Sequence, residues 1–236
     1  MEMVTGKGRP EFLRKLHRRL GVVFCVFVLM ASGSGLLHNL MTRTQNPPPR
    51  ALPTRALGLE AVRVPPQALG NIPDGAGPVT GLSIRSIDGQ PWYQVVMSSK
   101  SPPAYVSAVD GRREDAMDGR YAAQIAADFL GGAPVRQTAY LTAFNGEYLN
   151  IFRLLPVYRF DCADGKGTRV YVSTVTGTVT RHTDNRRQWE ANLFSGLHKF
   201  HFIGNKDVRD LILSVTTLGI FLTAAAGLAL FFRRLR

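Results

Sequence analysis

Two long apolar runs, one near each end of the chain, constrain this sequence more than any other feature. The first extends from Leu20 to Leu40 and the second from Leu211 to Phe232. At a rise of about 1.5 Å per residue, a helix of either length crosses a hydrocarbon core of roughly 30 Å. We therefore predict transmembrane helices at 20–40 and 211–232, and a membrane protein in preference to a soluble enzyme.

Basic residues at the two ends predict the orientation. Nine of the 29 Lys and Arg residues lie in the tails 1–19 and 233–236. Short segments rich in Lys and Arg stay on the cytoplasmic side, so we expect a bacterial inner-membrane protein with both tails cytoplasmic and the centre periplasmic. A cleaved signal peptide ending near 32–35 is the alternative for the first run. That run is longer than a typical signal core, which favours the anchor.

The net charge of +12 would suggest nucleic acid as the partner of a soluble protein. Here the tails account for much of the excess, and the centre shows no basic stripe with interleaved aromatic residues. We therefore predict the lipid bilayer as a partner and no nucleic acid. Between the spans we assign an extended linker at 41–56, an outer domain at 57–185 and an amphipathic interfacial segment at 186–210.

The outer domain contains an internal repeat of two sequence blocks. Each block alternates bulky residues with small or polar ones, as half-buried strands do, and the second block of each copy ends on a glycine suited to a positive φ. Asp-Gly pairs precede or interrupt each copy and predict hairpin turns. The blocks are PWYQV at 91–95 with YVSAVDG at 105–111, and PVYRF at 156–160 with YVSTVTG at 171–177.

One amphipathic helix separates the two copies, over residues 114–130. Its bulky residues recur every four positions, and Gly131-Gly132 supplies a stop. We expect this stripe to be buried against a sheet and the charged residues on the other side to face solvent. The fold class is therefore α+β, with antiparallel β meanders around one helix. The stripe consists of Met117, Tyr121, Ile125 and Phe129.

Five short segments follow one another along the chain: 16–21 (LHRRLG), 34–37 (SGLL), 156–158 (PVY), 171–179 (YVSTVTGTV) and 197–199 (LHK), the last followed by Gly204. In this order they resemble the PepSY-associated transmembrane family. The resemblance implies a periplasmic PepSY-like domain anchored by transmembrane helices. The family's isolated domains are associated with inhibiting or chaperoning secreted peptidases, and some relatives with more spans are haem-containing reductases of ferric siderophores. Val172-Ser173 replaces the usual valine-aspartate, and this chain has two spans where many relatives have four.

Motifs for catalysis are absent from the sequence. It contains no Walker loop, G-x-S-x-G, paired-cysteine metal site or H-E-x-x-H. His182 is the outer domain's one histidine, and we expect it to be exposed. Three aspartates that suggest a metal site are better explained by local hydrogen bonding in turns; they are Asp161, Asp164 and Asp184.

The two cysteines lie too far apart along the predicted topology to pair within one chain. Cys25 falls in the first span and Cys162 in the outer domain. We interpret both as unpaired small residues. A bridge between two chains through Cys162 is the alternative.

Histidines near the predicted membrane surface are the candidate cofactor ligands. His38 leaves the first span on the outer side, where His198 and His201 approach the second at a spacing that would share a helix face. A b-type haem needs two axial imidazoles that face each other. His38 with His198 or His201 meets the requirement of common depth, whereas His17 has no partner on the cytoplasmic side. A role as membrane-surface anchors is the competing interpretation.

Small residues at four-residue spacing predict close helix packing within the spans. Ala31 and Gly35 form one such face, and Gly219, Thr223 and Gly227 form the other. These faces could pack between the two spans of one chain, between the chains of a homodimer, or against another membrane protein, and the sequence does not decide among the three. Neither span contains Asp, Glu, Lys or Arg, which disfavours an ion or solute pathway.

These observations favour a non-catalytic accessory or binding subunit whose outer domain docks on a partner membrane or secreted protein. The alternative is a haem-bearing electron-transfer subunit related to the ferric-siderophore reductases. A reduced-minus-oxidised spectrum of the purified protein separates the two.

Overall fold

A computed structural model describes residues 8–45, 55–71, 78–98, 102–152 and 154–234. The chain divides into two compact units, which we call the helical unit (1–46 and 189–236) and the sheet unit (47–188). The architecture is α+β, with an apolar helix at each end of the chain and β structure in the centre, as the sequence predicts.

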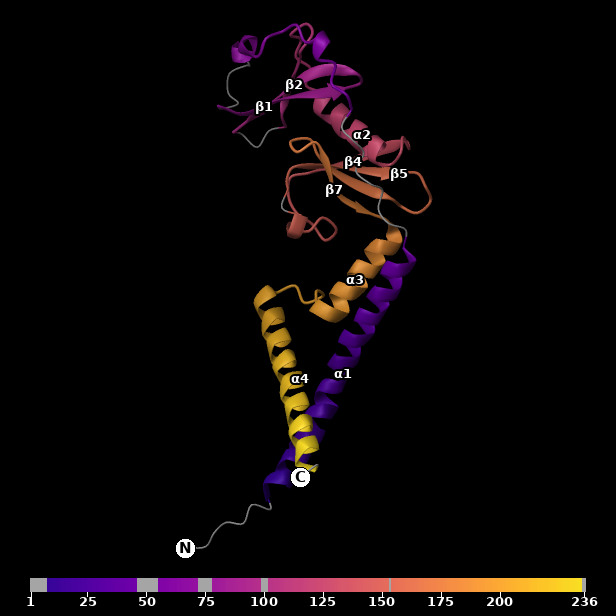
Figure 1. Ribbon diagram of the computed structural model, residues 1–236, viewed down its shortest axis with the longest axis vertical. Helices are drawn as coiled ribbons and strands as arrows, with labels where there is room; N and C mark the ends of the chain where they lie inside the picture. Colours follow the sequence, from indigo (N-terminus) through magenta and orange to yellow (C-terminus); the bar gives the residue numbers. More distant parts are fainter. Residues whose placement is uncertain (1–7, 46–54, 72–77, 99–101, 153, 235–236) are drawn as a thin grey trace. The chain divides into compact units, whose positions relative to one another are not determined.

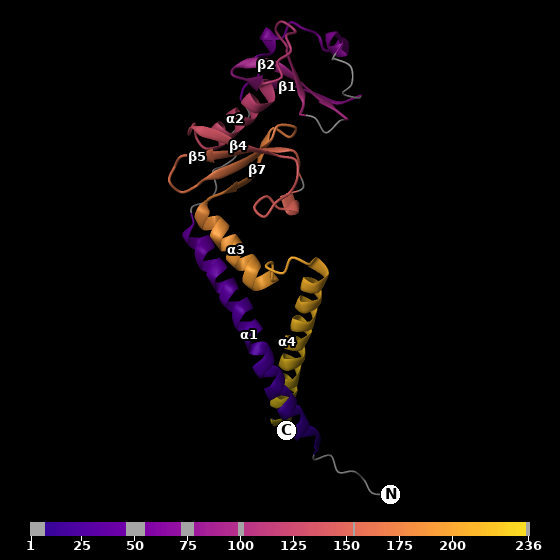
Figure 2. The same ribbon diagram turned by 180° about the vertical axis from the view of Figure 1, so that it is seen from behind.

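The helical unit is built on α1 (Gly8–Thr44) and α4 (Lys206–Arg234), which converge near the C-terminus (Figures 1 and 2). Both are long and apolar enough to cross a membrane, over Glu11–Thr44 and Lys206–Arg233. α1 continues four residues into the stretch 41–56 assigned to the linker, from Met41 to Thr44. The proline-rich remainder of that stretch, 46–54, lies outside the described residues.

The third helix, α3 (Asn185–Lys199), ends because Phe200 adopts a left-handed conformation, with φ of 49°. The His201 amide then donates to the Ser195 carbonyl at 3.1 Å, which closes the end of the helix. Phe200 tolerates this backbone because its buried ring packs edge-on against Phe27 of α1, with centroids 5.8 Å apart. The prediction that His198 and His201 share a helix face is therefore wrong.

The sheet unit contains two antiparallel meanders with α2 (Met117–Phe129) between them in sequence, as the repeat predicts. The first sheet has the order β1-β2-β3 and the second the order β4-β5-β6-β7. Short 3-10 turns η1 (Leu59–Ala61), η2 (Pro66–Asn71) and η3 (Asn150–Phe152) lie in the connections. The strands are β1 (Val79–Ile87), β2 (Gln90–Met97), β3 (Ala104–Ser107), β4 (Val135–Leu141), β5 (Val157–Cys162), β6 (Arg169–Ser173) and β7 (Thr178–Thr183).

The two copies of the repeat pair their strands in the same register. Tyr93 lies opposite Val106 in the first copy, and Tyr158 opposite Val172 in the second. The turns after these strands also match, since each closes with a glycine amide donating to a serine carbonyl, at 3.0 Å in the first and 2.9 Å in the second. The second copy continues into β7, whereas the first makes a single bridge, Val106 to Arg113, before α2 begins.

Helix α2 packs on both sheets and forms the centre of the core. Met117 and Tyr121 are buried with residues of the first sheet, while Ala122 and Ala126 are buried against the second. The predicted stripe is confirmed, with Ile125 and Phe129 partly buried at its far end. Asp118, which we expected to face solvent, is instead 2% exposed. The reason is that both of its carboxylate oxygens accept hydrogen bonds inside the unit.

Each sheet is also covered on its other face. Val62, Val64 and Leu69 pack against Tyr93 and Val106 of the first sheet. The loop between β4 and β5 covers the second sheet, where Tyr148 stacks on Tyr171 and Phe152 stacks on Tyr148. Both sheets are thus buried on two sides, which explains why β3 and β6 contain only buried residues.

Candidate functional site

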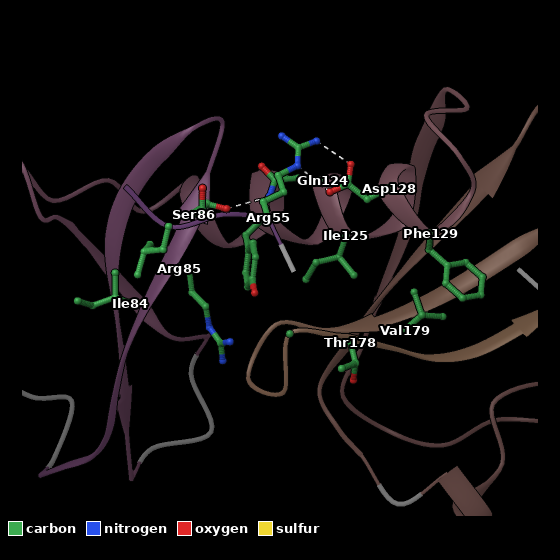
Figure 3. Close-up of a pocket in the computed structure, with 13 residues that line it drawn as sticks. Arg55, Ile84, Arg85, Ser86, Gln124, Ile125, Asp128, Phe129, Thr178 and Val179 are labelled. Carbon is green, nitrogen blue, oxygen red and sulfur yellow. Dashed lines mark hydrogen bonds and ion pairs between the residues drawn. The ribbon is translucent and has the colours of Figure 1, made fainter. Parts of the chain in front are cut away.

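A cleft of about 380 Å³ in the sheet unit lies between the two meanders (Figure 3). Three consecutive residues of β1 line one side, and three consecutive residues at the start of β7 line the other. Successive side chains of a strand point to opposite faces, so each strand borders the cleft with its edge. Both are the outermost strands of their sheets. The lining residues are Ile84, Arg85 and Ser86 on β1, Tyr121, Gln124, Ile125, Asp128 and Phe129 on α2, Gly177, Thr178 and Val179 at β7, and Arg55 and Leu57.

Gln124 of α2 holds the end of β1 beside the cleft. Its side-chain nitrogen donates to the Ser86 carbonyl at 2.9 Å, and its oxygen accepts from the Asp88 amide at 2.8 Å. Asp88 and Gly89 both have positive φ, the backbone of a tight two-residue hairpin. One glutamine thereby attaches the β1–β2 turn to the helix that forms the floor of the cleft.

Arg55 and Asp128 close one rim of the cleft with a two-pronged ion pair. The Nε and Nη2 atoms of Arg55 donate to the two carboxylate oxygens at 2.8 and 2.6 Å. Their side chains are 46% and 31% exposed. Water screens a pair this exposed, so we expect the ion pair to contribute at most about 1 kcal/mol to stability. Its main role is to hold the segment that contains Leu57 in place beside the cleft.

Arg85 connects the first copy of the repeat to the turn of the second. Its Nε donates to the Gln94 side chain at 3.0 Å, and its Nη2 donates to the Val175 carbonyl at 3.2 Å. The guanidinium lies 5.8 Å from the ring centre of Tyr121. Burial raises the pKa of Tyr121, although Arg85 opposes the shift, so this phenol is neutral at physiological pH.

A buried carboxylate, Asp118, lies deeper in the unit and joins the two copies. Tyr105 donates to its Oδ1 at 2.7 Å from the first sheet, and Tyr158 donates to its Oδ2 at 2.8 Å from the second. Gln94 extends the network by donating to the Tyr105 hydroxyl at 2.7 Å and to the Thr174 carbonyl at 2.8 Å. Burial, followed by the Asp118 charge, raises the pKa of both Tyr105 and Tyr158, so both remain donors.

Sequence reasoning missed this network, although one signal was present. An acid within the first turn of an otherwise apolar helix, close in sequence to the repeated tyrosines, is a candidate internal acceptor. His182 was also misplaced. It is half-buried, its ring lies 5.5 Å from that of Phe129, and burial lowers its pKa, helped by the neighbouring Arg187.

The three aspartates considered for a metal each serve local structure. Asp164 accepts from the Lys166 and Thr168 amides, Asp184 accepts from the Arg187 amide at the start of α3, and Asp161 pairs with Arg159. Within the described ranges, no group of three His, Cys, Asp or Glu residues is arranged to hold a metal ion. Both cysteines are free, with Cys25 exposed and Cys162 half-buried.

The histidines of the helical unit are partnered individually. His38 Nδ1 lies 2.6 Å from Glu190 Oε1, and His198 Nδ1 lies 3.3 Å from Ser34 Oγ. The Phe194 ring lies against both imidazoles, with centroid distances of 5.0 Å to His38 and 4.8 Å to His198. His201 is separate and lies 3.5 Å from an Arg209 nitrogen.

This arrangement does not fit a bis-imidazole haem. Such a haem requires two imidazoles facing one iron across an open slot, whereas Phe194 contacts both His38 and His198. The face of α3 turned to α1 consists of Glu190, Phe194 and His198. Glu190 fixes the rotation of α3, because its 7% exposed side chain accepts a hydrogen bond from Gln45 and pairs with His38.

The small residues of α4 pack against α1 of the same chain. A Cβ at Gly219 would lie 2.0 Å from the Phe24 ring, and one at Gly227 would lie 2.9 Å from the His17 ring. His17 Nδ1 is 2.9 Å from the Thr223 carbonyl oxygen. By contrast, a Cβ at Gly35 would meet nothing within 4 Å. The Gly219-Thr223-Gly227 face thus contacts α1 of the same chain, at Phe24 and His17.

Comparison with known proteins yields no assignment. No family model, curated protein or solved structure matches this chain.

Proposed function

We propose that this chain is a membrane-anchored, non-catalytic binding module of PepSY type, whose outer domain docks an extended segment of a partner protein. The observation that carries the proposal is the cleft bordered by the edges of β1 and β7. An edge strand presents backbone N–H and C=O groups that an added strand satisfies, and neighbouring pockets take alternate side chains.

The floor of the cleft suits apolar side chains of such a segment. Ile125 and Phe129 of α2 border it (Figure 3), and Leu57 also lines it. The polar groups around the cleft are engaged with one another, as in Arg55–Asp128 and Gln124–Ser86. Among the described lining residues, none forms the nucleophile–base pair that covalent catalysis requires.

The electron-transfer alternative receives no support from the histidine arrangement, so we do not carry it forward. Anchoring in the bacterial inner membrane, with both termini cytoplasmic, remains part of the proposal and rests on the basic tails and the two apolar helices. Alkaline phosphatase inserted after Gly165 should be active and the same enzyme fused after Arg236 inactive. The reverse pattern would refute the orientation.

Docking is tested with the purified full chain in detergent and a phage-displayed library of random twelve-residue peptides. We expect enrichment of peptides with alternating apolar residues. Thr178→Trp should reduce their binding at least tenfold, because this exposed residue lines the cleft and an indole there would obstruct the β7 edge. The matched control is Thr176→Trp, an exposed position in the same turn that does not line the cleft.

The outcome that contradicts docking is equally clear. Peptides whose binding is unchanged by Thr178→Trp, or reduced equally by Thr176→Trp, would show that the cleft is not the binding site. Amide hydrogen exchange supplies a second measurement, because an added strand should slow exchange along β1.

A further inference from the structure

A groove of about 760 Å³ runs between α1 and α4 in the helical unit, and we call it the α1–α4 groove. Its floor is where the two helices touch, at His17, Phe24 and Thr223. Its walls are almost entirely apolar and include Leu29 on α1 with Leu228 and Phe231 on α4, which are 71%, 58% and 58% exposed.

Glycines create the depth of this groove. Phe24 and His17 approach α4 closely because Gly219 and Gly227 have no side chain in their way. Gly21 lines the groove itself and leaves room beside Thr223. An apolar channel between two candidate transmembrane helices, open along its length, has the shape and chemistry of a site for a hydrocarbon chain.

One end of the α1–α4 groove lies beside unneutralised positive charge. Arg14 and Arg18 precede Gly21 by about two turns and one turn, so they share its face of α1. Neither forms an ion pair with any acid in the described residues, whereas their neighbour Lys15 pairs with Glu11 at 2.8 Å. An apolar groove that ends beside two guanidinium groups is complementary to an anionic amphiphile.

We propose that the α1–α4 groove binds an anionic phospholipid, with one acyl chain along the groove and the phosphate at Arg14 and Arg18. This inference rests on the membrane anchoring proposed above. The polybasic start of α1 attracts anionic lipid in general, whatever the shape of the helix surface. The groove adds a second requirement, since a bound lipid must place its chain against Ala224 and Leu228 while its phosphate meets Arg14.

The test measures lipid retention by native mass spectrometry of the full chain, exchanged from detergent into nanodiscs that contain equal amounts of phosphatidylglycerol and phosphatidylcholine. We expect phosphatidylglycerol to be retained preferentially. Replacing Arg14 and Arg18 together by Gln should reduce that preference at least fivefold. The matched control replaces Lys15 and Arg19 by Gln, which removes the same charge at the same spacing from the adjacent face of the helix.

A second pair of variants tests the groove separately from the charge. Ala224→Leu places a larger side chain in the groove, whereas Ala225→Leu adds the same bulk at an exposed neighbouring position outside it. Only Ala224→Leu should lower phosphatidylglycerol retention. Glycerol 1-phosphate, which carries the headgroup charge without a chain, should not displace the lipid.

Three results would overturn the proposal. The wild-type chain could retain the two lipids equally, the Arg14/Arg18 and Lys15/Arg19 variants could lose the same preference for phosphatidylglycerol, or Ala224→Leu could retain phosphatidylglycerol fully. Failure of the wild-type chain to enter nanodiscs would instead refute membrane anchoring. Loss of peptide docking at the cleft would leave the lipid result unaffected, because the two assays probe different units of the chain.

Discussion

The two copies of the repeat share a backbone plan but use it differently. In each, a tyrosine at the same position donates its hydroxyl to a carboxylate, Tyr105 to Asp118 and Tyr171 to Glu147. Asp118 belongs to α2 and also accepts from the second sheet. Glu147 belongs to the covering loop of its own copy and pairs with Arg169 at 2.8 Å. The same strand pattern therefore supports a link between copies in one case and a local clamp in the other.

The length of the last strand in each copy explains this divergence. In the first copy the chain leaves the sheet after one bridge and enters α2 almost at once, so the helix brings its own acid beneath Tyr105. In the second copy β7 continues the sheet to Thr183, and Tyr171 is covered instead by the loop that carries Glu147 and Tyr148. The two copies thus diverge in the segment immediately after their shared turn.

The largest effect is expected from Met117→Asp, which tests the packing of α2 on the first copy. Met117 is 3% exposed within the first apolar cluster, so a carboxylate there is buried without a partner. We expect a loss of about 4 kcal/mol or failure to fold. Unfolding of the full chain in detergent, monitored by Trp92 fluorescence in a Trp189→Phe background, measures it. A change below about 1 kcal/mol would contradict the assigned packing of α2.

The second largest loss of stability is expected when the Asp118 carboxylate, the acceptor shared by the two copies, is removed. Asp118→Ala removes the acceptor of the buried Tyr105 hydroxyl and of the partly buried Tyr158 hydroxyl, at a cost of about 2–4 kcal/mol. Asp118→Asn, which keeps one oxygen, should fall between this variant and wild type. Asp115→Ala is the control, because that side chain is 81% exposed and its removal should change stability by less than about 0.5 kcal/mol. Equal losses of stability in Asp115→Ala and Asp118→Ala would show that the Asp118 hydrogen bonds do not link the two copies.

The matched turn glycines provide the most direct comparison of the two copies. Gly111 and Gly177 have φ of 77° and 70°, so alanine at either should cost about 1 kcal/mol from backbone strain. A Cβ at Gly177 would also lie 2.8 Å from the Tyr121 hydroxyl and 3.1 Å from an Arg85 nitrogen, whereas at Gly111 the nearest atom is 3.8 Å away. Gly177→Ala should therefore lose about 2–3 kcal/mol in the same unfolding assay. Equal losses would show that the second turn is not a contact point.

The smallest effect is expected at the local clamp. Burial raises the pKa of Glu147, but hydrogen bonds from Arg169 and Tyr171 outweigh it and leave the folded pKa below the ordinary 4.5. Its contribution is therefore complete above that ordinary value and is lost as pH falls through the lower folded pKa. Glu147→Gln should lower the free energy of unfolding by about 1 kcal/mol at pH 7, and by less at an acidic pH below the folded pKa of Glu147. Thermal unfolding at both pH values checks this, and an equal deficit at the acidic pH would reject the assignment.

The features that the sequence determined are those set by neighbouring residues. The long apolar runs produce α1 and α4, because only length and hydropathy are needed for a helix able to cross a membrane. Period-2 alternation and a terminal glycine determined both meanders and their matching turns. The four-residue spacing from Met117 to Phe129 determined the buried stripe of α2.

Tertiary structure decided which polar groups meet, since those contacts join residues far apart in the chain. Asp118 became an acceptor only when two sheets brought tyrosines to it, and the cleft exists only because the edges of β1 and β7 border the same helix. Likewise, Phe27 allows Phe200 to end α3 and so separates His201 from His198. A local pattern specifies how a segment folds, whereas the partner of a buried charge or a packed ring depends on the three-dimensional contacts of the folded chain.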